Sequence, residues 1–142
     1  MTGVGGIAHV TLLCSPAQLA GVKDFYERVI GLEPGARPSF EFPGEWLYAG
    51  KEPVIHLAAV LDDASRAPVE ASRSALPGGT RATGSIDHIA FRATGTVDES
   101  RGRLQRCGIA FTEAPVPDFP LYQLFLNGPL GVKIELNFEL QP

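Results

Sequence analysis

The sequence is short of charge, and what charge it has is not basic. Only 20% of the 142 residues are charged, and 16 acidic side chains against 12 Lys and Arg leave a net charge of −4. The isoelectric point is near 5.3. A protein that binds nucleic acid through its phosphates needs a basic surface. We therefore expect a small-molecule substrate as the partner, and no nucleic acid.

Cysteine and long apolar runs are also scarce. Cys14 and Cys107 are the only cysteines, which is too few for a disulfide framework and too widely spaced for a close pair of metal ligands. No apolar stretch approaches the roughly 20 residues of a membrane-spanning helix, and the start MTGVGGIAHV lacks the basic, apolar pattern of a signal peptide. The sequence thus predicts a cytoplasmic protein without a membrane partner.

Hydrophobic residues, by contrast, make up 44% of the chain, enough to bury a full core, and their pattern repeats. A shift of 79 aligns residues 7–10, Ile-Ala-His-Val, with residues 86–89, Ile-Asp-His-Ile. The same shift aligns residues 54–57, Val-Ile-His-Leu, with residues 133–136, Lys-Ile-Glu-Leu. Two separated segments that share one register predict a duplicated structural unit.

Each half also predicts one helix that opens with a capping box. In residues 15–18 a serine is followed three positions later by glutamine, and in residues 96–99 a threonine is followed by glutamate. Such pairs satisfy the free N–H groups of a first helical turn. Glycine then ends each pattern, so we expect the first helix to stop at Gly31 and the second, about one turn shorter, at Gly108.

Three short β-type stretches follow each helix. They are residues 39–42, 46–49 and 54–60 in the first half, and residues 109–112, 122–126 and 132–138 in the second. Each half therefore reads as strand, helix and three strands, which predicts an α+β fold of two tandem βαβββ modules. We assign residues 1–61 to the first module, residues 62–85 to a linker of Pro, Gly and small polar residues, and residues 86–142 to the second.

The three histidines of the chain and one glutamate occupy equivalent positions of the repeat, with His9 matching His88 and His56 matching Glu135. Alternate side chains of a strand share a face, so these four are predicted to line one wall, from which Asp87 should point away. A single histidine on an apolar strand is usually structural. Burying three imidazoles and a carboxylate together, however, requires several hydrogen-bond partners, whereas one divalent metal ion uses all four. The pattern therefore predicts a divalent-metal site.

With these features the sequence resembles members of the vicinal-oxygen-chelate superfamily, which includes glyoxalase I, extradiol dioxygenases, fosfomycin-resistance transferases and bleomycin-resistance proteins. The resemblance rests on Ile-x-His at the start of each half, on Phe-Tyr and Gly-Leu within residues 25–32, and on Pro-x-Gly-x-x-x-Glu in residues 129–135. It covers residues 7–138 and implies two βαβββ modules that form a curled mixed sheet around a metal cleft, often in a homodimer.

The resemblance also divides the four positions into roles. It implies metal ligands at His9, His88 and Glu135, with His56 either a catalytic acid or base or a fourth ligand. Extradiol dioxygenases fit best, because their Fe(II) is held by the equivalents of those three residues and a histidine that is not a ligand lies on the strand of His56. They generally have a tyrosine where this chain has Phe125. Two alternatives therefore stay open: a glyoxalase-like lyase or isomerase that uses Zn, Ni or Mn, and a bleomycin-resistance-like protein that sequesters its ligand.

Aromatic and basic residues near these positions are candidates for the walls of a substrate pocket. Aromatic rings on strands suit a flat substrate, and an arginine suits a substrate carboxylate. The predicted pocket residues are Trp46, Tyr48, Arg92 and Tyr122. Arg37 is a similar candidate for a carboxylate partner.

Overall fold

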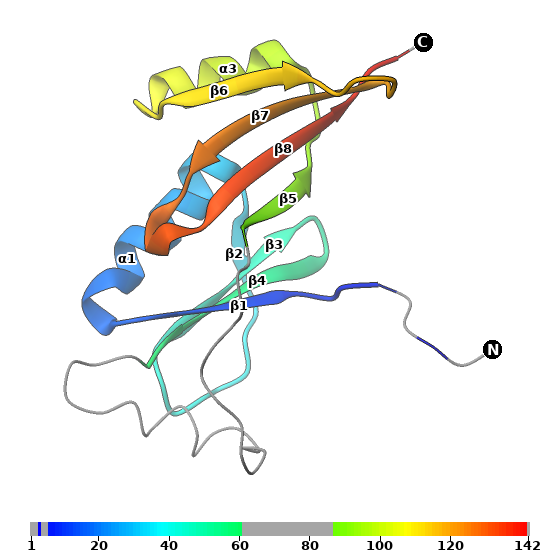
Figure 1. Cartoon of the computed structure of the whole chain (residues 1–142). Helices are drawn as coiled ribbons and strands as arrows, with labels where there is room; N and C mark the ends of the chain where they lie inside the picture. The colour runs from blue at the N-terminus through cyan, green and yellow to red at the C-terminus, as the bar shows by residue number, and fades with distance from the viewer. Residues whose placement is uncertain (1–2, 4–5, 61–86, 142) are drawn as a thin grey trace. The chain divides into compact units, whose positions relative to one another are not determined.

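The computed structural model describes Gly3, residues 6–60 and residues 87–141. The chain divides into two compact units, Met1–Arg81 and Ala82–Pro142, and each is built on a four-stranded mixed sheet (Figure 1). The fold is thus α+β with two tandem modules, as the sequence predicts. The predicted linker, residues 62–85, lies outside the described residues.

The sheet of the first unit places its first and last strands side by side. Its strands are Val10–Cys14 (β1), Glu33–Gly35 (β2), Gly44–Ala49 (β3) and Glu52–Ala59 (β4). They lie in the order β1-β4-β3-β2, with β1 parallel to β4 and the other neighbours antiparallel. His9 immediately precedes β1, so this order brings it beside the strand that carries His56.

The sheet of the second unit repeats this arrangement. Its strands are His88–Arg92 (β5), Phe111–Pro115 (β6), Leu121–Asn127 (β7) and Lys133–Glu139 (β8). They lie in the order β5-β8-β7-β6, and β5 is parallel to β8. A short 3-10 turn, Pro129–Gly131, joins β7 to β8. The second unit therefore places His88, at the start of β5, beside the strand that carries Glu135.

The repeat predicted from the sequence extends to the pairing of individual residues. Thr11 pairs with His56 in the first unit, and Ala90, 79 positions after Thr11, pairs with Glu135 in the second. On the other side of the same strands, Trp46 pairs with His56 and Phe125 pairs with Glu135. The two sheets are thus in the same register, and His56 and Glu135 occupy the same place in each.

One helix in each unit follows its first strand and begins with the predicted capping box. In the first unit the α-helix Pro16–Asp24 (α1) continues as a π-helical segment, Phe25–Ile30, and Gly31 ends it at φ 91°. Ser15 accepts a hydrogen bond from the backbone of Gln18, whose side chain accepts one from the Ser15 backbone. Gly31 adopts a left-handed backbone that a residue with a Cβ rarely takes, which explains the sharp helix end.

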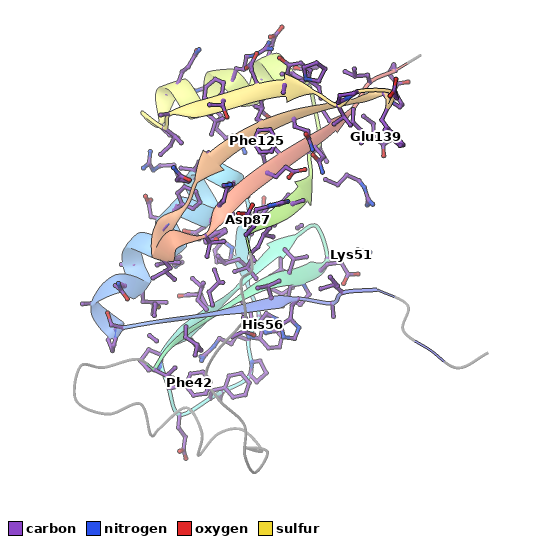
Figure 2. The ribbon with its side chains drawn as sticks, in the orientation of Figure 1. Phe42, Lys51, His56, Asp87, Phe125 and Glu139 are labelled. Carbon is purple, nitrogen blue, oxygen red and sulfur yellow. The ribbon has the colours of Figure 1, made fainter. Side chains whose placement is uncertain are left out.

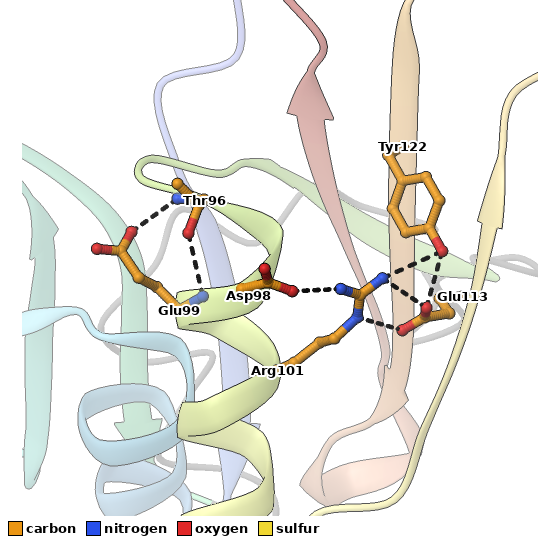
Figure 3. Close-up of polar contacts among 6 residues, drawn as sticks. All are labelled: Thr96, Asp98, Glu99, Arg101, Glu113 and Tyr122. Carbon is orange, nitrogen blue, oxygen red and sulfur yellow. Dashed lines mark hydrogen bonds and ion pairs between the residues drawn. The ribbon is translucent and has the colours of Figure 1, made fainter.

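The helix of the second unit, Val97–Arg106 (α3), is built in the same way (Figure 3). The Thr96 hydroxyl accepts from the Glu99 N–H at 3.1 Å, and the Glu99 carboxylate accepts from the Thr96 N–H at 2.7 Å. Gly108 follows at φ 67°. Both predicted helix ends are therefore confirmed. Among the described residues, no helix is long and apolar enough to cross a membrane.

One predicted strand is wrong. Residues 39–42 form no strand, and the outer strand of the first sheet is instead β2, Glu33–Gly35. Pro38 and Pro43 flank the predicted stretch, and proline cannot donate to a strand ladder. The stretch instead forms a loop whose two phenylalanines, Phe40 and Phe42, stack on each other with ring centres 5.1 Å apart.

Strand alternation separates each sheet into a buried apolar face and a polar face. On β4, Ile55 and Leu57 are each 1% exposed, and His56 between them points the other way. On β8, Ile134 and Leu136 are likewise buried on either side of Glu135. The apolar residues stabilise the sheets by burying surface, and His56 and Glu135 lie on the opposite face of each sheet.

Candidate functional site

The first unit assembles a stack of three aromatic side chains from three neighbouring strands. The imidazole rings of His9 and His56 lie 3.7 Å apart at an interplanar angle of 9°. The Trp46 ring covers the other side of His56, with centres 3.9 Å apart and an angle of 13°. The predicted neighbours His9 and His56 are therefore together, and Trp46 packs on His56 from β3. Figure 2 labels His56 on β4.

The hydrogen bonding of His56 leaves one of its ring nitrogens without a partner. Its Nε2 is enclosed and has no hydrogen-bond partner among the described residues. The backbone of Pro53, which offers only a carbonyl, acts on the ring as an acceptor, and with Nε2 unpartnered we assign the ring proton to Nδ1. This tautomer leaves a lone pair on Nε2, the form that binds a metal ion or accepts a proton.

The pKa of the His56 imidazole is lowered from its usual value. Burial is the largest cause, because it disfavours the charged ring, and the neighbouring His9 lowers the pKa further. The hydrogen bond to Pro53 acts in the opposite direction. His56 is therefore neutral at pH 7, in keeping with a free lone pair on Nε2.

The second unit brings its two predicted ligands into direct contact. His88 Nε2 lies 2.9 Å from Glu135 Oε2, and Glu135 Oε1 accepts a hydrogen bond from Gln123 Nε2 at 2.5 Å. Glu135 is only 7% exposed and is the one buried polar or charged residue among those described. A carboxylate is costly to bury unless it is paired or hydrogen-bonded, and these two contacts supply that support.

Asp87 corrects an expectation from strand alternation. It was predicted to point away from His88, but its Oδ2 lies 2.8 Å from His88 Nδ1 and 3.3 Å from Lys133 Nζ. Because β5 begins only at His88, the pleat of the strand does not fix the direction of the preceding side chain. The hydrogen bond from His88 is the main cause of a lowered pKa at Asp87, and Lys133 adds to it. Asp87 thus fixes the imidazole of His88 from the side opposite Glu135.

Gln123 and Asn137 are functional candidates that the sequence reasoning missed. The Gln123 amide donates to Glu135 and, at 3.0 Å, to Asn137 Oδ1, so it fixes the orientation of the buried carboxylate. The available signal was a single glutamine in the otherwise apolar stretch of residues 121–126. Finding its partner also required the register of β7 on β8, in which Gln123 pairs with Asn137.

The donor atoms of both units suit a divalent metal ion. Two ligands at about 2.1 Å from one ion and at right angles lie about 3 Å apart, close to the 2.9 Å between His88 Nε2 and Glu135 Oε2. The enclosed lone pair on His56 Nε2 is a further donor without a partner. In neither unit do the described residues bring three or more His, Cys, Asp or Glu side chains together. Each unit therefore supplies one pair of candidate donors, His9 with His56 in the first and His88 with Glu135 in the second.

The described residues also form a pocket in the first unit. It has a volume of about 200 Å³, and its lining includes His9, His56 and Trp46 together with Arg37, Phe40 and Phe42. Arg37, one of two candidate partners for a substrate carboxylate, thus lies in the same pocket as two of the predicted metal-site histidines. Trp46, a predicted substrate-pocket residue, belongs to this lining.

Tyr48 shares a strand with Trp46 but has a different role. Its hydroxyl donates to the Ala36 carbonyl at 2.6 Å, and its ring packs so closely over Gly35 that a Cβ there would lie 2.6 Å from the ring. These contacts hold β2 against β3. The lining of the pocket does not include Tyr48.

Tyr122 was predicted as a pocket residue, and the structure places it on the other face of its sheet. Tyr122 alternates with Gln123, whose amide contacts Glu135, so its ring points toward α3 instead. There its hydroxyl donates to Glu113 at 2.8 Å and lies 3.4 Å from Arg101 (Figure 3). Arg92 lies four residues after His88 on β5, hence on the same face of the strand, and it is exposed at the end of β5.

The contacts of Tyr122 and Arg101 with Glu113 can be tested by the titration of the Glu113 carboxyl group. Two hydrogen bonds from Arg101 and one from Tyr122 lower the pKa of Glu113 from 4.5 to about 2. Because the folded pKa is depressed, the stabilisation is present above the unfolded pKa and is lost as the pH falls through about 2. We expect the Glu113 carboxyl carbon to titrate near pH 2 by NMR, and closer to 4.5 in Arg101→Met. Arg106→Met, on the exposed side of the same helix, is the control. A wild-type midpoint near 4.5 would contradict this network.

Solved structures with the same arrangement of strands identify the fold. A protein assigned to the glyoxalase family from Bacillus anthracis superimposes with a TM-score of 0.67 and 21% identity, over 98% of each chain. The chain has the glyoxalase-like fold. A lactoylglutathione lyase from Agrobacterium tumefaciens matches with a TM-score of 0.63 and 20% identity, over 96% of each chain. A fosfomycin resistance protein from Listeria monocytogenes matches with a TM-score of 0.60 and 14% identity, over 96% of this chain and 94% of that one.

The glyoxalase-like fold confirms the two-module architecture implied by the resemblance to the vicinal-oxygen-chelate superfamily. Neither a family model nor a curated protein sequence matches this chain. The matched structures carry names of different activities, and one fold supports many chemistries. The reaction must therefore be argued from the side chains of this chain.

Proposed function

We propose that this chain is a divalent-metal-dependent enzyme that binds a small substrate through two neighbouring oxygen atoms. The ligands in this proposal are His9 from the first unit and His88 and Glu135 from the second. The observation that carries it is the contact between His88 and Glu135, which is 2.9 Å long and lies at a buried carboxylate. Two imidazoles and one carboxylate on one side of an ion are typical of Fe(II) enzymes, so Fe(II) is the favoured metal.

The residues around these ligands would hold them in binding orientation. Asp87 accepts from Nδ1 of His88, which leaves Nε2 as the metal-binding nitrogen. Gln123 bonds one oxygen of Glu135 and leaves the other for the metal. Such an ion, when bound, supplies Lewis acidity to the substrate oxygens and, if it is iron, a site at which dioxygen reacts.

His56 is proposed as the acid or base of the reaction. Its Nε2 lone pair is enclosed and without a partner, and its ring is held between His9 and Trp46. A proton on a substrate hydroxyl in this pocket would pass to Nε2, because the Pro53 carbonyl favours the ring proton on Nδ1. A histidine base beside a three-ligand site, with aromatic walls around it, favours ring cleavage of a catechol-type substrate by dioxygen.

One observation favours a second function, that of a glyoxalase-like lyase or isomerase. Phe125 pairs directly with Glu135 across the β7–β8 ladder, so no tyrosine hydroxyl is present at that position. In this alternative Zn, Ni or Mn replaces iron, and His56 removes a carbon-bound proton instead of a hydroxyl proton. A third reading, a protein that sequesters an aromatic ligand, is supported by the pocket alone and leaves the buried Glu135 and His88 pair without a role.

The proposed ligand set also bears on assembly. His9 belongs to one unit and the His88–Glu135 pair to the other, so a three-ligand site requires both units, from one chain or from two copies of it. We propose a homodimer because the superfamily that the sequence resembles often assembles in this way, and a cytoplasmic location, where thiols such as Cys14 and Cys107 remain reduced.

Metal content and oxygen uptake test these functions together. Protein purified anaerobically without added metal should contain close to one iron per chain, and a panel of catechols should give oxygen uptake. Zinc, nickel or manganese without uptake would favour the lyase or isomerase, and absence of metal would favour the binding protein. Gel filtration coupled to light scattering separates monomer from dimer.

A further inference from the structure

The pocket of the first unit is walled by flat aromatic surfaces. One wall contains the Trp46 ring, which stacks on His56. A second wall contains the Phe40 and Phe42 rings, which are parallel to within 5°. Phe40 approaches Trp46 with ring centres 6.5 Å apart. Aromatic faces attract planar ligands through stacking and edge contacts, so this pocket favours a flat molecule over a branched one.

The size of the pocket limits that molecule to one ring. Its volume is about 200 Å³, and a cavity of about 150 Å³ in another protein is large enough for benzene. The difference leaves space for small substituents on the ring. Two fused rings with substituents would exceed this volume.

The charge of the pocket is set by Arg37. The guanidinium lies over the Phe40 and Phe42 rings, 5.1 and 5.3 Å from their centres, and its Nη2 donates to the Phe42 carbonyl at 2.8 Å. Among the described residues that line the pocket there is no Asp or Glu. The positive charge of Arg37 is therefore not neutralised by the pocket lining.

Arg37 also carries a donor that nothing in the described chain satisfies. Its Nε is enclosed and has no hydrogen-bond partner there. Enclosed donors without acceptors cost free energy, and the cost is larger for a charged group. Gly44 faces this arginine, since a Cβ at that position would lie 3.0 Å from Arg37 Nη2 and 2.2 Å from the Leu57 carbonyl. The backbone of Gly44 thus makes room for the guanidinium to stay where it is.

From these observations we infer that the pocket binds a single-ring aromatic carboxylate, with its ring among Phe40, Phe42 and Trp46 and its carboxylate on Arg37. A carboxylate supplies the acceptor that Arg37 Nε lacks and forms the charge-assisted hydrogen bond that guanidinium groups favour. The inference names the substrate class of the proposed enzyme and rests on that proposal, since His9 and His56 line the same pocket. Binding of the acid itself does not require the metal.

Trp46 makes the inference directly testable, because it is the only tryptophan of the chain. Its fluorescence therefore reports on this pocket alone. The full-length protein, treated with EDTA to remove metal, is titrated with benzoate, with its neutral counterpart benzamide, and with the non-planar anion cyclohexanecarboxylate. We expect saturable quenching by benzoate, with affinities at least tenfold weaker for benzamide and for cyclohexanecarboxylate.

Substitution of Arg37 then assigns the effect to one residue. Arg37→Met should weaken benzoate binding at least tenfold and leave benzamide binding unchanged. Arg106→Met, an exposed arginine on α3, is the matched control, and circular dichroism checks folding. If Arg37→Met does not fold, Arg37→Lys, which keeps the charge but lacks the Nε donor, should still bind benzoate more weakly than the wild type.

Two outcomes would overturn the inference: equal affinity for benzoate and benzamide in the wild type, or an unchanged preference for benzoate in a folded Arg37 variant. Its failure is distinct from that of the proposed enzyme. If the protein contains no metal as purified, before EDTA treatment, but binds benzoate with the expected preference, the proposed enzyme activity is wrong and the pocket assignment stands. If the protein contains metal and takes up oxygen but shows no preference for benzoate, the enzyme proposal stands and the pocket assignment is wrong.

Discussion

Replacing Glu135 with alanine is expected to abolish metal binding, with metal content falling from about one ion per chain to less than a tenth of that. The carboxylate is the only anionic ligand in the proposed set, and it is held at 7% exposure by contacts with His88 and Gln123. Without it, two neutral imidazoles would have to hold the ion alone. The measurement is elemental analysis after dialysis, followed by calorimetric titration of metal-free protein with Zn²⁺. His88→Ala should give the same result.

Two further variants separate loss of a ligand from a general effect on the strand. Glu139→Ala removes an exposed carboxylate from the same strand and should leave the metal content unchanged. Gln123→Leu keeps Glu135 but removes the hydrogen bond that orients it, and should weaken metal affinity by about 10–100-fold. Full metal content in Glu135→Ala would show that the ion is held elsewhere.

The repeat explains why so much of the fold could be predicted from the sequence. Both halves carry the same pattern at a shift of 79. A prediction of which side chains face the core in one sheet therefore applied to the other sheet as well. Thr11 with His56 and Ala90 with Glu135 are pairs in the same register, and His56 and Glu135 lie opposite buried apolar residues as expected. The capping boxes and the glycines at the helix ends were predictable because they depend only on residues a few positions apart.

The failures lie where strand alternation does not apply. Asp87 precedes β5 by one residue, so its direction is set by hydrogen bonds with His88 and Lys133 instead of by the pleat. Residues 39–42 have the apolar alternation of a strand, but their flanking prolines and the cation of Arg37 above Phe40 and Phe42 favour a loop. The strand predicted at residues 109–112 of the second half has an equivalent in the first half. The shift of 79 places that equivalent at residues 30–33, which overlaps the start of β2 at Glu33. The repeat therefore located this outer strand better than the strand-like alternation of residues 39–42 did.

The pocket itself could not be predicted from the sequence, because it depends on that loop. Phe40 and Phe42 come into position only when residues 36–43 leave the sheet, and Arg37 then lies over both rings. Tyr48 and Tyr122 were predicted to line a pocket as strand aromatics. Their hydroxyls instead reach the Ala36 carbonyl and Glu113, which shows why an aromatic residue on a strand is weak evidence for a binding site.

His56→Ala is expected to leave the metal in place and to lower turnover by about 10²–10⁴-fold, the range of a lost general acid or base. In the proposed enzyme the ligands are His9, His88 and Glu135, so metal content after dialysis should equal that of the wild type. The large loss arises because Nε2 of His56 is the enclosed nitrogen with a free lone pair in this pocket. Elemental analysis and turnover are measured on the same preparation, since only their combination assigns the role.

The alternatives for His56 give different combinations. Loss of the metal in His56→Ala would make His56 a fourth ligand and would remove the main support for ring cleavage. Retained metal with normal turnover would make it a structural partner of the aromatic stack. If turnover falls in His56→Ala, His56→Gln separates loss of a base from a packing defect, because glutamine still offers a polar group beside Trp46 but cannot act as a base near pH 7. If the base is what matters, His56→Gln should be as slow as His56→Ala, whereas a packing role would be partly restored by the larger side chain.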